Sequence, residues 1–358
     1  MDSRERVMLA LRFEEPDRIP IDFWGSAGFF DALCVKRGIT KEEFLELTGA
    51  DLRYIEGPRY VGPMIDEGSD IWGVPRRSVK VETSEGEETY KEVVMSPLKP
   101  DMSLDEISEY PHWPSADWFD YSGIASQCDE VISKGKIVVF MGDRLNRIAQ
   151  LKPAIYLRGY EQILVDMLVD TDVAGLIFQK IATFYKEYLD RILEAAKGKI
   201  DIILTGDDFG EQRQSLVSPE TWISLLRKGF SRFNEIIHTY GAMSMHHTCG
   251  NVIELAPHLV EGGLDILQSL QPEAMSANYE QLKQTYHGKL CFHGGMSIQN
   301  TLPFGSPEDI SAEVKRLMEV LSPGGGYIIS TAHNVQSDCS LENVDALIRA
   351  YHRFGNYG

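Results

Sequence analysis

The sequence of 358 residues has few cysteines, and none of them are paired in a recognisable motif. The five cysteines stand at positions 34, 128, 249, 291 and 339, and no two of them form a CxxC motif. An odd number of scattered cysteines argues against a disulfide framework and favours a reducing compartment. We therefore expect a cytoplasmic protein.

The sequence also lacks a long apolar run and a surplus of basic residues. No segment approaches the ~18 consecutive apolar residues that a membrane helix needs, and the charged N-terminus leads into an amphipathic pattern rather than a signal peptide. The formal net charge is −19, so most of the surface repels phosphate groups. We expect neither a membrane protein nor a protein that binds nucleic acid.

Short apolar runs alternate with longer helical patterns along the whole chain. Hydrophobic residues make up 43% of the sequence, which is enough for a large core. The expected strands are residues 19–23, 52–55, 137–141, 201–205, 242–246, 264–267, 289–292 and 327–330. Helical patterns between and after them include 172–196, 219–239, 253–261, 307–321 and 341–354. Eight strands that alternate with helices predict a (β/α)8 TIM barrel, with a doubly wound sheet as the alternative.

One insertion interrupts this alternation, between the second and third expected strands. Residues 79–94 contain two runs of alternating polarity around Ser84-Glu-Gly86, which predicts a β-hairpin. No change in composition marks a second domain. We therefore expect residues 1–358 to form a single barrel domain.

The most informative pair of residues is His247 and Cys249, at the end of the fifth expected strand. In a parallel barrel the carboxyl ends of the strands surround one mouth, where the chemistry takes place. Residues two apart on an extended chain project from the same face, so this imidazole and thiol can bind one metal ion. Zinc needs at least three protein ligands. The candidates for the third ligand are His333 after the last strand, then Cys339, then Asp207 or Asp208 after the fourth strand.

Other polar side chains at the expected strand ends are candidates for catalysis. Asp207 and Asp208 are adjacent carboxylates that water-excluded surroundings cannot both stabilise cheaply, so we expect at least one of them to be functional. The alternative is that one of them caps the following turn. His293 follows the seventh strand and is a further catalytic candidate. Cys291 lies inside that strand and is expected to pack in the barrel, because a free cysteine behaves as a small hydrophobic residue.

A set of motifs spread over the full length of the chain matches a known superfamily. The motifs are Pro16-Asp-Arg-Ile-Pro-Ile21, Gly206-Asp-Asp-Phe-Gly210 with Ser218-Pro219, His247-Thr-Cys-Gly-Asn251, Phe292-His-Gly-Gly295, and Gly325-Gly-Tyr-Ile328 through His333-Asn334 to Glu342-Asn343. Together they resemble the uroporphyrinogen decarboxylase superfamily, and in particular its branch of cobamide-dependent methyltransferase-like proteins. The resemblance implies a (β/α)8 barrel, in agreement with the strand count, and a homodimer is compatible with it.

The methyltransferase branch implies a zinc ion bound by a His-x-Cys pair and by a later cysteine near the last strand. His247 and Cys249 match the pair, and His333 stands where the later cysteine is expected. Imidazole can replace thiolate as a zinc ligand. The resemblance also implies the reaction, which is methyl transfer between a small substrate (a methyl ether, a methylamine or a thiol) and a cobalamin. This corrinoid belongs to a partner protein, since the sequence has no Asp-x-His-x-x-Gly motif of its own.

Four residues are candidates for contact with the small substrate. We expect Trp24, Phe29 and Tyr54 to form an apolar wall that suits an aromatic methyl ether. Gln268, just past the sixth expected strand, supplies a hydrogen-bonding group on the other side of the mouth.

Two other functions remain as alternatives. Uroporphyrinogen decarboxylases carry an arginine-bearing Met-Arg-Gln-Ala-Gly-Arg segment after the first strand, whereas residues 23–30 of this chain contain no arginine. A cofactor-free decarboxylase would therefore depend on Arg53, Arg59 and Arg144 to bind the carboxylates of its substrate. The third hypothesis is a non-catalytic ligand-binding barrel, because a fold does not fix a function.

Overall fold

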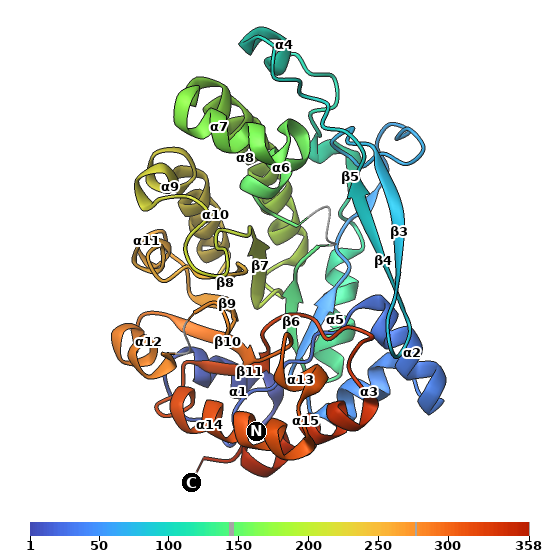
Figure 1. The fold of residues 1–358 in the computed structure, drawn as a ribbon, viewed down its shortest axis with the longest axis vertical. Helices are drawn as coiled ribbons and strands as arrows, with labels where there is room; N and C mark the ends of the chain where they lie inside the picture. Colours follow the sequence, from blue (N-terminus) through green and yellow to red (C-terminus); the bar gives the residue numbers. More distant parts are fainter. Residues whose placement is uncertain (143–146, 276–277, 358) are drawn as a thin grey trace.

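The structure is a computed structural model that describes residues 1–142, 147–275 and 278–357 (Figure 1). Its central sheet has seven parallel strands in the spatial order β1-β6-β7-β8-β9-β10-β11. These strands are β1 (Leu52–Ile55), β6 (Ile137–Phe140), β7 (Ile202–Gly206), β8 (Met243–His247), β9 (Ile266–Leu270), β10 (Cys291–Met296) and β11 (Tyr327–Thr331). The sheet curls, so that its first and last strands approach each other.

The segment around Ile21 lies between β11 and β1. The backbone N–H of Asp22 donates to Ile329 at 2.9 Å, and that of Asp51 donates to Ile21 at 2.8 Å. The predicted (β/α)8 TIM barrel is confirmed, but residues 19–23 form a single β-bridge rather than a full strand. Pro20 has no N–H to donate, and the N–H of Ile21 donates to the Asp51 carboxylate instead of to a strand.

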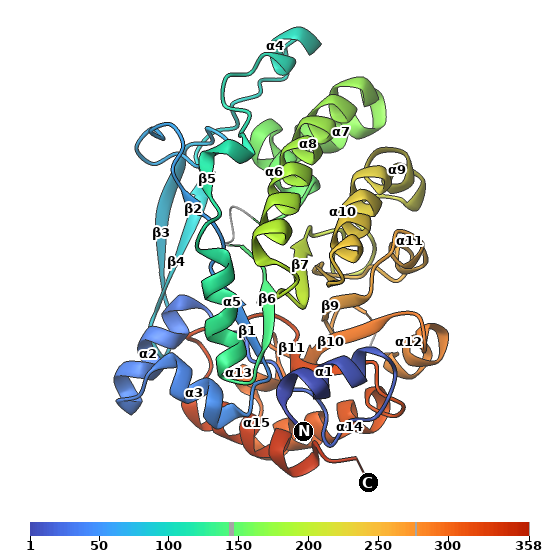
Figure 2. The ribbon, with the colours of Figure 1, turned by 180° about the vertical axis from the view of Figure 1, so that it is seen from behind.

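Helices surround the barrel and close one of its ends (Figure 2). The helices of the surrounding layer include α5 (Ile124–Ser133), α8 (Thr171–Ala196), α10 (Arg227–Thr239), α11 (Ala256–Glu261), α12 (Tyr279–Tyr286), α14 (Pro307–Leu321) and α15 (Leu341–Phe354). Helix α1 (Ser3–Leu11) begins with a capping box at Asp2, and its Val7 and Leu11 pack against the apolar interior of the barrel. This contact covers the amino ends of the strands and leaves the carboxyl ends for function.

Shorter elements connect these parts of the chain, and α4 lies farthest from the barrel, beyond α6 and α7 (Figure 1). They are α2 (Ala27–Arg37), α3 (Lys41–Thr48), β2 (Arg59–Tyr60), α4 (Leu104–Ser108), the 3-10 helix Ala116–Trp118, β5 (Phe119–Asp120), α6 (Leu151–Arg158), α7 (Tyr160–Val169), α9 (Pro219–Leu225) and α13 (Thr301–Phe304). Of the helices in the described residues, none is long and apolar enough to cross a membrane.

The predicted β-hairpin is confirmed, and it is inserted after β1. Its strands are β3 (Arg76–Glu82) and β4 (Glu87–Val93), which pair antiparallel through their whole length. The hairpin runs along one side of the barrel, and its turn lies beside α2 (Figure 1).

Two details of the sequence prediction are wrong. The helix expected at 219–239 is divided into α9 and α10 at Leu226. The side chain of Gln150 donates to the Leu226 carbonyl at 3.1 Å and lies against Gly229, where a β-carbon would collide with it. Strands β9 and β10 also extend past the polar residues at which the prediction ended them, so Gln268 and His293 lie within strands.

Candidate functional site

The inner face of the barrel changes character along the strands, and two sets of inward-facing side chains, which we call the lower and the upper ring, mark this change. The lower ring is apolar and fully buried, and comprises Leu52, Val139, Leu204, Met245, Ile266, Cys291 and Ile328. Residues two positions further on share the same face of a strand, so they form the next ring toward the carboxyl ends. This upper ring comprises Tyr54, Met141, Gly206, His247, Gln268, His293 and Ser330. The expectation that Cys291 packs in the barrel is confirmed, and the polar side chains begin one layer above it.

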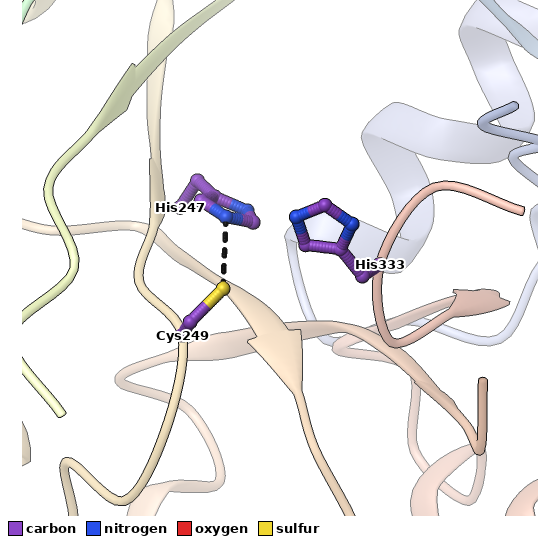
Figure 3. Close-up of side chains that lie close together, drawn as sticks. All are labelled: His247, Cys249 and His333. Carbon is purple, nitrogen blue, oxygen red and sulfur yellow. Dashed lines mark hydrogen bonds between the residues drawn. The ribbon is translucent and has the colours of Figure 1, made fainter. Parts of the chain in front are cut away.

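Three potential metal ligands meet at the carboxyl ends of the strands (Figure 3). His247 ends β8, Cys249 follows it, and His333 reaches across from the loop after β11. The Nε2 atom of His247 lies 3.3 Å from the Cys249 Sγ atom, and one ligand atom from each of the three residues lies within 4.8 Å of the others. In the part of the chain that the structure describes, this is the one cluster of His, Cys, Asp or Glu with such a geometry.

Gly250 allows the chain to turn immediately after Cys249. Its φ angle of 82° lies in the left-handed region, which favours glycine. A β-carbon at this position would lie 2.3 Å from the carbonyl carbon of Gly210, because the loops after β7 and β8 are in direct contact. The N–H of Gly210 donates to the Cys249 carbonyl at 3.1 Å, which fixes the cysteine relative to the neighbouring loop.

His247 is held in the tautomer that a metal ion requires. Its Nδ1 atom lies 3.0 Å from the side-chain oxygen of Gln268, which can only accept a hydrogen bond. Nδ1 therefore carries the hydrogen, and Nε2 presents its lone pair toward Cys249. Burial lowers the pKa of His247 well below its usual range, and the Arg147 guanidinium and the His333 ring act in the same direction. The imidazole is therefore neutral.

Cys249 needs a neighbouring cation to ionise. Burial and the adjacent Asp208 carboxylate raise the pKa of its thiol to about 12. A divalent metal ion would offset both effects, because a coordinating thiol loses its proton. Two neutral imidazoles and a sulfur are a donor set that suits zinc, and three protein ligands leave the fourth position of a tetrahedral site open. The residues present therefore fit a catalytic zinc ion.

Cys339, the second candidate for the third ligand, does not belong to this cluster. Its side chain is buried, and its Sγ atom lies 3.5 Å from the carboxylate of Asp338. Of the acidic candidates, Asp208 lies closest to the cluster, with Oδ1 3.8 Å from His247 Nε2.

Asp207 and Asp208 have different surroundings although they are adjacent. Asp207 is buried and accepts the backbone N–H groups of Gln150 and Lys152, each at 2.7 Å, at the start of α6. Burial raises its pKa to about 6, although these hydrogen bonds oppose the shift. Asp207 therefore stabilises α6, and its predicted catalytic role has no support in these contacts. The alternative expected for one residue of the pair was a cap on the following turn, whereas Asp207 binds the start of α6, which precedes it in the sequence.

Asp208 lies toward the cluster and is ionised. It pairs with Lys152 at 2.8 Å and accepts the N–H of Cys249 at 3.4 Å. Burial alone would raise its pKa, but several opposing effects, of which the Lys152 charge is the largest, together hold the pKa below the usual range of an aspartate. Asp208 therefore places a negative charge beside the cluster.

His293 forms a buried chain of hydrogen bonds with Asp22, which precedes α2, and with Tyr54 of β1. Its Nε2 atom lies 2.9 Å from the Asp22 carboxylate, which also accepts the hydroxyl group of Tyr54 at 2.6 Å. Asp22 and His293 are each about 1% exposed. Among the described residues, Nδ1 of His293 has no hydrogen-bond partner. Sequence analysis missed Asp22, although its position in an apolar strand, Ile19-Pro-Ile-Asp-Phe23, was a usable signal.

Of the three residues expected to form an apolar wall, Trp24 and Tyr54 reach the mouth and Phe29 does not. The Trp24 ring lies 5.5 Å from the His247 ring and 5.7 Å from the His333 ring. Trp24 and Tyr54 also border a cavity of about 760 Å³. Phe29 is buried in α2 against Phe23 and other core rings, so the prediction for this residue is wrong.

A second cavity, of about 710 Å³, lies directly beside Cys249. Its walls comprise the loop 210–214, Gly250, Gln271 and Gln299. The side-chain oxygen of Gln271 accepts the N–H of Gly250 at 2.5 Å, so this glutamine is tied to the turn after Cys249. The cavity gives a small polar molecule access to the cysteine.

Of the three arginines on which a decarboxylase would depend, the two that the structure describes pair with carboxylates away from the metal-ligand cluster. Arg53 is buried beside α3, where it pairs with Glu42 and Glu46, and Arg59 pairs with Asp120 at the surface. Arg144 lies outside the described residues. Among the described residues, Arg147 places its guanidinium at the mouth, 5.4 Å from the centre of the Trp24 ring, and it was not predicted from the sequence.

Comparisons with known proteins identify one matching family model and several solved structures that resemble this chain. The family model described as uroporphyrinogen decarboxylase (URO-D) matches residues 149–354. A methyltransferase from Methanosarcina mazei has the same fold, with a TM-score of 0.70 at 17% sequence identity over 99% of each chain. The YdhT protein from Bacillus subtilis matches with a TM-score of 0.43 and 12% identity over 99% of this chain and 89% of its own. No curated protein matches the sequence.

Proposed function

The chain belongs to the uroporphyrinogen decarboxylase family, and from this premise we propose that it is a zinc-assisted methyltransferase. It moves a methyl group between a small substrate, which is a methyl ether, a methylamine or a thiol, and a cobalamin carried by a partner protein. The observation that supports this proposal most is the cluster of His247, Cys249 and His333 at the mouth of the barrel. The likeness in fold to a methyltransferase agrees with it.

The three ligands and their neighbours have separate tasks in this proposal. His247, Cys249 and His333 would hold the zinc ion, which would supply Lewis acidity toward the oxygen, nitrogen or sulfur atom that loses or gains the methyl group. Gln268 orients His247 through the hydrogen bond to Nδ1. Asp208 keeps a negative charge beside the cluster and so favours a bound cation.

The substrate lies in the cavity beside Cys249, between the cluster and the loop 210–214. Gln271 and Gln299 offer amide groups that orient a small polar molecule. Trp24 covers the two imidazoles from the other side and helps to exclude water from them. A partner protein would bring the cobalamin to this mouth, where its reduced cobalt would supply a strong nucleophile for the methyl group.

In this proposal, His293 transfers a proton to or from the group that loses the methyl. Asp22 accepts the hydrogen on Nε2 and thereby leaves Nδ1 as the reactive nitrogen, in the way that a carboxylate orients a catalytic histidine. Tyr54 donates to the same carboxylate and holds it in place. Burial and the Asp22 charge raise the pKa of Tyr54 well above its usual range, so its hydroxyl remains a donor.

The experiment is an anaerobic methyl-transfer assay with reduced cobalamin. The zinc-loaded protein is incubated with a panel of methyl ethers, methylamines and methyl thioethers, and the absorbance of methylcobalamin is recorded. We expect one donor class to give product in the wild type and none in Cys249→Ala. Conversion of uroporphyrinogen to coproporphyrinogen, retained in Cys249→Ala, would contradict the proposal and favour the decarboxylase.

A further inference from the structure

The turn of the inserted hairpin meets the two loops that carry Trp24 and His333. Thr83 donates through its hydroxyl to the Ser337 carbonyl at 2.8 Å, and the N–H of Glu85 donates to the same carbonyl at 3.0 Å. Ser337 is four residues beyond His333 on the loop after β11. The hairpin therefore touches the segment that carries the third ligand.

Glu88 makes the strongest of these contacts, although it is a carboxylate in a buried position. Its Oε1 atom accepts the Ser26 hydroxyl at 2.5 Å and both the N–H and the hydroxyl of Ser337 at 2.9 Å. The side chain is 5% exposed, and no ion pair among the described residues includes it. Ser26 caps α2 by accepting the N–H of Phe29, so the carboxylate also lies at a helix N-terminus, where a negative charge is favoured.

The two loops joined by Glu88 are also joined to each other. The N–H of Ser26 donates to the Val335 carbonyl, and that of Val335 donates to the Trp24 carbonyl, each at 2.8 Å. The Trp24 ring in turn lies against the His333 ring. His333 lies in an irregular loop between β11 and this short ladder, and its carbonyl accepts the Thr331 hydroxyl at 2.6 Å. Its position therefore depends on contacts made on both sides of it.

We propose that Glu88 is a positioning residue for the metal site and that, through Ser337 and Ser26, it holds His333 in place to bind the ion. This inference rests on the proposed function, because it presupposes that the cluster binds zinc. The inference assigns the inserted hairpin the role of holding the loop that carries His333. Residues that orient a metal ligand typically affect metal affinity by about 10- to 100-fold when they are removed.

The test measures zinc affinity by competition with a chromogenic chelator, together with the visible spectrum of the cobalt(II) form. We expect Glu88→Ala to bind zinc about 10- to 100-fold more weakly and to alter the cobalt spectrum, which reports the number and type of ligands. Glu88→Gln keeps an oxygen that can accept the N–H of Ser337 and should restore most of the affinity. Glu92→Ala is the control, since Glu92 stands on the same strand with an exposed side chain.

A double-mutant cycle separates positioning from a general loss of stability. If Glu88 acts through His333, then Glu88→Ala causes no further loss of zinc affinity in the His333→Ala background. An equal loss in both backgrounds, or wild-type affinity in Glu88→Ala, would overturn the inference. Ser337→Ala provides the same comparison if Glu88→Ala does not fold. If His333→Ala itself binds zinc as the wild type does, the proposed metal site fails rather than the role of Glu88 alone.

Discussion

The lower and upper rings of the barrel are built on the same strands but have opposite characters. On β8, for example, Met245 belongs to the lower ring and His247 to the upper ring. The lower ring buries apolar side chains between the strands and α1, which contributes to stability. The upper ring consists mostly of polar side chains, several of which are buried without enough partners to satisfy them.

This difference shows how the fold prepares the site. The apolar ring and the surrounding helices exclude water from the layer above, and this desolvation keeps His247 neutral and raises the pKa of Cys249. Buried polar groups cost stability unless they are paired. The buried polar groups of the upper ring lower the free energy of unfolding. Apolar burial in the lower ring and in the helical layer offsets this loss. Substitutions in the lower ring should therefore change mainly the free energy of unfolding, and substitutions in the upper ring should change mainly zinc affinity.

The largest expected effect on stability comes from a cavity in the lower ring. Leu204 is fully buried, and its strand β7 carries none of the three ligands. Leu204→Ala should lower the free energy of unfolding by about 2–5 kcal/mol, measured by urea denaturation. Zinc affinity should remain that of the wild type, because the ligands lie one layer above. A large loss of zinc affinity in the folded variant would show that the two rings are not independent.

A smaller effect should separate the adjacent residues Asp207 and Asp208. Asp207→Asn leaves one backbone N–H at the start of α6 without its acceptor, and should cost about 1–3 kcal/mol of stability with little change in zinc affinity. Asp208→Asn removes a partly exposed ion pair, for which we expect a stability loss of about 1 kcal/mol or less. It should instead weaken zinc binding, because it removes the negative charge beside the cluster. The reverse pattern in denaturation and zinc titration would contradict this division.

An effect of similar size is expected for the pH dependence of stability at the lower end of the barrel. Burial lowers the pKa of Lys283 to about 8, although Cys291 and Glu15 oppose the shift, and its ammonium donates to the Gly325 carbonyl. Between pH 8 and the unfolded value of 10.5, the unfolded chain holds the proton and the folded chain does not. Stability from this group therefore rises with pH across that window, by about 1–3 kcal/mol. This pH dependence is checked by measuring the unfolding free energies of the wild type and of Lys283→Met at pH 7.5 and at pH 10. The difference between the two proteins should change in favour of the wild type at pH 10.

Much of the fold could be predicted from the sequence, because the apolar strands alternate with amphipathic helices. Strands β1 and β11 and helices α14 and α15 were placed within one residue of their bounds. The first strand was the exception, since its pairing depends on Pro20 and on the side chain of Asp51, which no periodicity reveals. The break at Leu226 similarly depends on a contact from Gln150, which lies 76 residues away in the sequence.

The candidate site was predictable in part. His247 and Cys249 are two apart, so their convergence follows from strand geometry alone, and His333 follows from the closure of a barrel. Asp22, Arg147 and Glu88 were missed, because their importance arises from contacts between distant segments. Phe29 was misplaced for the opposite reason: its nearness to Trp24 in the sequence does not make it a neighbour of the site. The local sequence pattern predicts which side chains of one strand face the candidate site. Tertiary contacts determine which side chains from distant segments also reach that site.

The measurement that tests the central claim most directly is the zinc content of protein purified anaerobically without chelators. The wild type is compared with His247→Ala, Cys249→Ala and His333→Ala by mass spectrometry, with folding checked by circular dichroism. The account predicts about one zinc ion per wild-type chain and a loss of most of it in each folded variant. A wild type without zinc that cannot be loaded with it, or three variants that retain the full content, would contradict the metal site.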